Sequence, residues 1–106
     1  MNRALATSVL LLLFSLPATV RAEDARVEVG HGKLEPAEVI VTAGDLVTWK
    51  NTVQMPGGHT VTSDDGSFES PALGKDESWS HRFEKLGSHG YHIKQHPDAK
   101  GKVVVE

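Results

Sequence analysis

Apolar and polar side chains alternate along most of the chain after residue 24, and this period of two predicts β-strands that each bury one face. No segment follows a helical period, and only residues 71–77 are candidates for a helical turn. The alternating segments are Val27 and Val29, Val39 and Val41, Val47 and Trp49, Thr60 to Thr62, Trp79 to Phe83, His89 to Ile93, and Lys102 to Val105.

Turn-forming residues separate these segments, as in Ala43-Gly44-Asp45, Asp64-Asp65-Gly66 and Leu86-Gly87. About seven short strands joined by turns predict an all-β domain, an antiparallel Greek-key β-sandwich. The side chains expected in its core are Trp49, Phe68, Trp79, Phe83 and Tyr91.

The first 22 residues have the pattern of a secretory signal peptide. Arg3 precedes a short apolar run over residues 9–16, and the segment ends in Val20-Arg21-Ala22, with small residues three positions before and directly before the expected cut. The run is well short of the roughly 20 residues that cross a bilayer, so retention as an anchor is the less favoured alternative. We expect residues 1–22 to be removed, residues 23–106 to form the domain, and the protein to be periplasmic.

Composition excludes several classes of function. The chain has 11 Lys and Arg against 14 Asp and Glu, and this acidic balance argues against binding to nucleic acid or to anionic membranes. It has no cysteine, which excludes disulfides, thiol catalysis, zinc fingers and iron–sulfur clusters. Apolar packing or a bound metal must therefore stabilise this small exported domain.

No catalytic motif stands out. The chain has no Ser–His–Asp order, no paired-carboxylate motif and no phosphate-binding loop, and Asp64-Asp65-Gly66 is typical of a turn. We therefore expect a binding protein and not an enzyme.

Six histidines are many for 106 residues, and two of them stand at strand ends. His59 follows the loop 54–58 directly, and His96 lies between two predicted strands and precedes Pro97. Loop residues converge at the pole of a sandwich, so we expect these two imidazoles to lie close together.

Four segments together resemble the plastocyanin and amicyanin branch of the cupredoxins: Val47 to Asn51, Gly58 to Thr62, Asp65 to Phe68, and Tyr91 to Gly101. The resemblance implies the cupredoxin fold and a copper site made by an early histidine and a late Cys-x-x-His-x-x-Met loop. His59 matches the first histidine and His96 the second. Ile93 stands where the family has cysteine, and Ala99 stands where it has methionine.

A blue-copper centre needs a thiolate beside its two imidazoles, so this chain cannot build one. The resemblance instead implies a more exposed, non-blue site that favours copper(II), with zinc as competitor. Further ligands stay open between water, Met55, His31 and His92. The pair Gly57-Gly58 resembles an insertion, which we expect to loosen the loop before His59.

Three functions remain in competition. The first is a periplasmic copper carrier, scavenger or sensor that works with a copper-handling or redox protein. The second is electron transfer, and the third is a metal-free interaction domain in which His59 and His96 are vestigial. His81 and His89 fall on inward faces, as partners for buried carbonyl groups or, less favoured, as a second metal pair.

Overall fold

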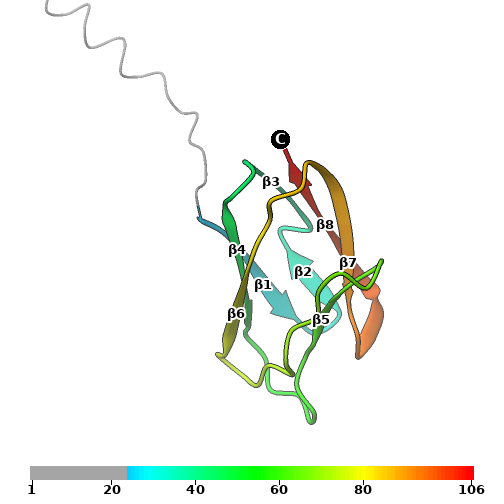
Figure 1. Ribbon diagram of the computed structural model, residues 1–106. Coiled ribbons are helices and arrows are strands. Elements are labelled where there is room, and N and C mark those ends of the chain that lie inside the picture. The colour runs from blue at the N-terminus through cyan, green and yellow to red at the C-terminus, as the bar shows by residue number, and fades with distance from the viewer. Residues whose placement is uncertain (1–23) are drawn as a thin grey trace, which may run out of the picture.

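The structure is a computed structural model that describes residues 24–106, so the expected signal peptide lies outside the described residues. Within that range every regular element is a strand, and the strands form two facing layers (Figure 1). The strands are β1 (Asp24–Gly30), β2 (Lys33–Glu35), β3 (Glu38–Val41), β4 (Leu46–Asn51), β5 (Val61–Ser63), β6 (Ser78–Arg82), β7 (Gly87–Ile93) and β8 (His96–Val105). No helix in this part of the chain has the length and hydropathy of a membrane span.

One sheet has the strand order β2-β1-β4-β6 and the other β3-β8-β7-β5. The predicted all-β sandwich is confirmed, but its sheets are mixed and not antiparallel throughout, because β1 pairs parallel with β4 and β3 pairs parallel with β8. These parallel neighbours are distant in sequence. Alternation along a strand fixes which face is buried and says nothing about the direction of the neighbouring strand.

Two boundaries also differ from the expectation. The three-residue strand β2, in which only the middle residue is buried, was not among the predicted strands. The last strand begins at His96 and not at Lys102, because residues 94–95 form a tight turn that leads from β7 directly into β8.

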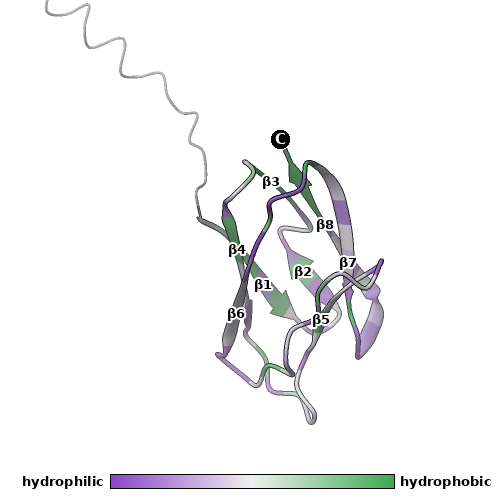
Figure 2. Cartoon of the chain, viewed as in Figure 1, coloured by the Kyte–Doolittle hydropathy of each residue, from purple (hydrophilic) through white to green (hydrophobic). Residues whose placement is uncertain are grey.

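The core lies between the sheets, around the fully buried ring of Trp49. Its ring centroid lies 5.2 Å from that of Tyr91 and 6.2 Å from that of Phe83. Of the predicted core aromatics only Trp79 is half-buried, since it lies on the edge strand β6. Figure 2 shows apolar residues along β1 and at the end of β8, where alternate valines point into this core.

Several strand ends meet at one pole of the sandwich. Strands β4 and β7 end there, at Asn51 and Ile93, and β8 begins there at His96. The loop between β4 and β5, at the lower end of Figure 1, closes the same pole. The fold thus gathers residues from loops that are far apart in sequence.

Candidate metal centre

His59 and His96 lie together at this pole, as their positions at strand ends predicted. The ring centroids are 5.3 Å apart and the ring planes are inclined by 51°. His59 has no exposed surface, and His96 is half-buried. The Nε2 atom of each ring is buried and has no hydrogen-bond partner.

A close backbone contact positions His59. Its N–H donates to the carbonyl of Leu73 at 3.0 Å, and the N–H of Leu73 donates back to the carbonyl of His59 at 2.8 Å. Gly58 has a φ of +75°, and a Cβ at this position would meet the Leu73 carbonyl oxygen at 2.8 Å. Only glycine fits this approach. The structure therefore does not support the expected loosening at Gly58, which is buried and packed against the chain.

The imidazole of His59 is held from behind by Asn51, the last residue of β4. The Nδ1 atom of His59 lies 3.0 Å from the Asn51 side-chain oxygen. The Asn51 amide nitrogen donates to the Leu73 carbonyl at 2.8 Å. The side-chain amide of Asn51 therefore connects the His59 ring to the backbone at Leu73. Asn51 is fully buried, and its contacts fix the orientation of the ring.

The side chain of Gln95 ties the two histidine segments together. Its Oε1 accepts a hydrogen bond from the N–H of Thr60 at 2.7 Å, and its Nε2 donates to the Thr60 hydroxyl at 3.0 Å. Gln95 precedes His96 and Thr60 follows His59. The clamp therefore holds the turn that carries one imidazole against the segment that carries the other.

Burial is the main cause that lowers the pKa of His59, and the proximity of His96 and of His31 lowers this pKa further. A lowered pKa keeps the imidazole neutral at physiological pH. The neutral form is the one that binds a metal ion.

Apolar residues without sulfur occupy the two positions at which the family resemblance places cysteine and methionine. Ile93 is 1% exposed and Ala99 is 5% exposed, and both belong to the hydrophobic core. Within residues 24–106 no three side chains of the types His, Cys, Asp and Glu form a cluster that could hold a metal ion. The pole thus offers two nitrogen ligands and no thiolate.

The sequence matches the cupredoxin-like domain family over residues 3–105. The chain belongs to this family. It is 33% identical to amicyanin-alpha of Methylorubrum extorquens over 98% of this chain and 99% of that protein. It is 36% identical to amicyanin of Paracoccus denitrificans, over 76% of this chain and 63% of that protein. A solved Cu(I) structure of an amicyanin mutant superposes with a TM-score of 0.71 at 33% identity, over 83% of this chain and 87% of that one.

The other ligand candidates of this cupredoxin differ in their exposure and in their contacts. His31 is exposed, in the turn between β1 and β2, and Met55 is half-buried in the loop before Gly58. The Nδ1 atom of His92 lies 2.7 Å from the carboxylate of Asp64. His92 is half-buried, whereas its neighbour Ile93 is buried in the core.

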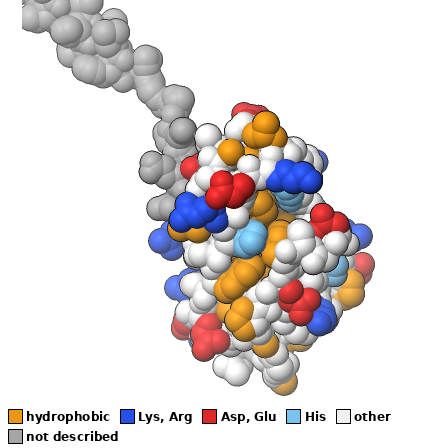
Figure 3. Space-filling view, in the orientation of Figure 1, with side chains coloured by type: hydrophobic (Ala, Val, Ile, Leu, Met, Phe, Trp, Pro, Cys, Tyr) orange, Lys and Arg blue, Asp and Glu red, His pale blue; other side chains and the backbone are white. Residues whose placement is uncertain are grey.

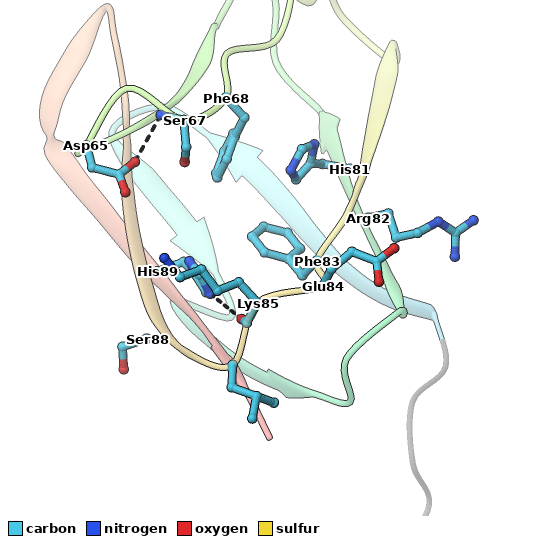
Figure 4. A pocket seen from close by; sticks show the side chains of 11 residues that line it. Asp65, Ser67, Phe68, His81, Arg82, Phe83, Glu84, Lys85, Ser88 and His89 are labelled. Carbon is cyan, nitrogen blue, oxygen red and sulfur yellow. Dashed lines mark hydrogen bonds between the residues drawn. The ribbon is translucent and has the colours of Figure 1, made fainter.

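A cavity of about 410 Å³ in this cupredoxin was not expected from the sequence. His81 and His89 line it together with Phe68 and Phe83, and Figure 4 shows the Phe83 ring between the two imidazoles. In Figure 3 apolar side chains form a band on one face of the molecule, with histidines beside it. His89 meets the carbonyl of Lys85 at 2.7 Å, but this contact is exposed, whereas a buried carbonyl was expected. His81 instead stacks on Phe68, with ring centroids 4.7 Å apart.

Asn51 and Gln95 were also not recognised as site residues from the sequence. Both are direct neighbours of the histidine segments in space, through hydrogen bonds to His59 and Thr60. The one available signal was position, because Asn51 ends a strand at the site and Gln95 precedes His96.

Proposed function

We propose that this cupredoxin binds one copper(II) ion through His59 and His96 in a non-blue site. We further propose that it acts in the periplasm as a copper carrier, scavenger or sensor. The supporting observation is the pair of buried Nε2 atoms without partners, on rings whose centroids are 5.3 Å apart. A buried polar nitrogen without a partner costs free energy, and coordination to a metal would remove that cost.

The separation of the rings suits a shared ion. Metal–imidazole bonds are about 2.0–2.1 Å long, so two imidazoles on one ion have ring centres roughly 4.5 Å apart at a right angle and roughly 6.3 Å apart in a straight line. The observed 5.3 Å lies between these limits. A pair of imidazoles favours copper(II) over the other common divalent ions, with zinc as the main competitor.

The residues at the pole do not suit a blue-copper centre, which argues against the electron-transfer alternative. A blue centre requires a cysteine thiolate, and the chain has no cysteine. Bound copper would supply a charged Lewis-acid centre at the pole. The chain's own contribution is to hold two neutral imidazoles, while Ile93 and Ala99 are buried in the core.

The test is to add copper(II) to the purified, untagged protein and to record stoichiometry, spectrum and melting temperature together. We expect one ion per chain, no intense visible absorption and a raised melting temperature, since a ligand of the native state stabilises it. Zinc(II) in a parallel titration should bind more weakly.

Each part of the proposal can fail separately. An intense colour with copper would contradict the non-blue site and indicate a thiolate from another molecule. No binding and no thermal shift with either ion would contradict the metal site and support the metal-free interaction domain. Metal analysis of protein from its native periplasm would then test the carrier role, since a resident copper ion should co-purify with it.

A further inference from the structure

The cavity of about 410 Å³ lies at the end of β7 that is remote from the pole. It is lined by the last residues of β6, the turn from β6 into β7, and the loop that follows β5 (Figure 4). Strand β7 begins at the cavity and ends at the pole, so the two sites lie at opposite ends of one strand. Small-molecule sites have volumes of roughly 300–1,000 Å³, and this cavity is within that range.

Four aromatic rings line the cavity, namely Phe68, His81, Phe83 and His89. The ring centroid of Phe83 lies 4.9 Å from that of His81 and 5.5 Å from those of Phe68 and His89. The two phenylalanines are buried, whereas the two imidazoles are half-buried. A planar aromatic guest that contacts such rings gains stacking energy in addition to the burial of its apolar surface.

His81 brings polar atoms into this apolar wall. It pairs across the sheet with Val47, which is fully buried, so the imidazole occupies an inward position on the edge strand β6. Burial, and then the proximity of His89, lowers the pKa of His81, which keeps its imidazole neutral near neutral pH. A neutral imidazole has one donor and one acceptor nitrogen.

The ring of His89 has a defined acceptor. Its Nε2 atom lies 2.7 Å from the carbonyl oxygen of Lys85, which can only accept, so Nε2 carries a proton. In the neutral ring Nδ1 is then left with a lone pair. The wall of the cavity therefore includes an acceptor nitrogen that suits a guest with an N–H or O–H donor.

The charges at the cavity balance. The charged residues that line it are two cations and two anions: Arg82, Lys85, Asp65 and Glu84. Arg82 donates to the carbonyl of Gly44 at 2.6 Å, and the Asp65 carboxylate accepts from the N–H of Ser67 at 2.9 Å. Because the charges cancel and two of them are engaged within the fold, the lining favours an uncharged guest over an ion.

We propose that this cavity binds a small uncharged aromatic molecule of one or two fused rings, which packs against His81 and Phe83 and donates a hydrogen bond to His89. Phenol and indole have this chemistry. The site is separate from the proposed copper site, since its lining contains neither His59 nor His96.

The first test is to titrate indole into the purified protein and to follow the ring signals of its six histidines by NMR. A pH of about 8 keeps the imidazoles neutral, since an unperturbed histidine titrates near pH 6.5. We expect saturable shifts at His81 and His89 and none at His31, which lies in an exposed turn. Shifts that do not saturate, or that are as large at His31, would overturn the proposal.

Matched probes test the class of guest. 1-Methylindole keeps both rings without the donor, and we expect indole to bind about 2–10-fold more tightly, which is the effect of one hydrogen bond. Cyclohexanol keeps a hydroxyl donor on a ring that cannot stack, and it should bind more weakly than phenol. Equal binding of cyclohexanol and phenol would show that the cavity does not select aromatic molecules.

Variants test the residues. His81→Leu removes an aromatic ring and should weaken indole binding by about 2–10-fold, whereas His81→Phe keeps a ring and should retain it. His89→Phe should abolish the preference for indole over 1-methylindole. Ser67→Trp places a large side chain at an exposed position of the lining and should block binding, with His31→Ala as the control. Undiminished binding in both His81→Leu and Ser67→Trp would place the guest elsewhere and overturn the proposal.

Discussion

The molecule holds two pairs of histidines, and their surroundings differ. At the pole, His59 and His96 face each other with ring centroids 5.3 Å apart and with one nitrogen of each ring buried and unpartnered. At the cavity, the Phe83 ring lies 4.9 Å from His81 and 5.5 Å from His89, between the two imidazoles (Figure 4). The two imidazoles at the cavity therefore both pack against one aromatic ring, whereas those at the pole pack against each other.

The difference follows from where each pair lies along its strands. His81 and His89 occupy positions within β6 and β7, where the neighbours on the same face are core aromatics. His59 and His96 lie at strand ends, where two loops converge and no aromatic side chain separates the rings. Whether a histidine can bind a metal ion thus depends on the partners of its ring nitrogens. The number of histidines in the chain is weak evidence for a metal site.

The largest expected effect is on metal affinity. His59→Ala or His96→Ala should lower the copper(II) affinity by more than about tenfold, because each removes one of two protein ligands. His81→Ala and His89→Ala should leave the affinity unchanged, although His81→Ala should lower the melting temperature through lost stacking on Phe68 and Trp79. Isothermal titration of all four variants checks this. Equal affinities throughout would place the site elsewhere, with His31 and His92 the next candidates.

The second expected effect is a gain of colour. Ile93→Cys combined with Ala99→Met should give an intensely coloured copper(II) protein, because both side chains are buried at the positions that carry sulfur in the family resemblance. His81→Cys in the wild-type background is the control and should stay pale. A folded double variant that binds copper without colour would show that residue 93 lies out of reach of an ion held by the two imidazoles.

The sequence alone predicted the sandwich, the buried faces of its strands and the pairing of His59 with His96. These features depend on local alternation and on strand ends, which are visible along the chain. The parallel pairing of β1 with β4 was not predictable in this way, since it depends on how distant segments cross between sheets. The hydrogen bonds of Asn51 and Gln95 also depend on contacts between separate segments, and no pattern of residue spacing in the sequence indicates them.

A smaller effect should come from the clamp between the two loops at the pole. Gln95→Leu removes both hydrogen bonds to Thr60 and leaves both imidazoles in place. A hydrogen bond contributes about 0.5–1.5 kcal/mol net, so we expect the copper affinity to fall by roughly 2–10-fold. Thr62→Val, which removes a hydroxyl bonded to Glu69 on the surface, is the control and should have no effect. An unchanged affinity in Gln95→Leu would mean that backbone contacts alone hold the loops together.

The smallest expected effect is a loss of stability of the metal-free protein in mild acid, to which one histidine of each pair, His59 and His81, contributes. Burial lowers the pKa of His59, with His96 and His31 adding to the shift, and burial together with His89 lowers the pKa of His81. An unfolded histidine titrates near pH 6.5, so between that pH and the lowered folded value the unfolded chain binds more protons than the native one. The free energy of unfolding is therefore greatest above about pH 6.5 and falls as the pH is lowered toward the folded pKa.

His81→Phe separates the two contributions, because it keeps an aromatic ring against Phe68 and Trp79 and removes one titrating group. Urea unfolding at about pH 7.5 and about pH 5.5 should show a smaller loss of stability in His81→Phe than in the wild type. The loss that remains is the part due to His59, and copper(II) should oppose it, since the ion binds only the neutral ring. If His81→Phe loses as much stability as the wild type, His81 contributes nothing to the acid sensitivity of the fold.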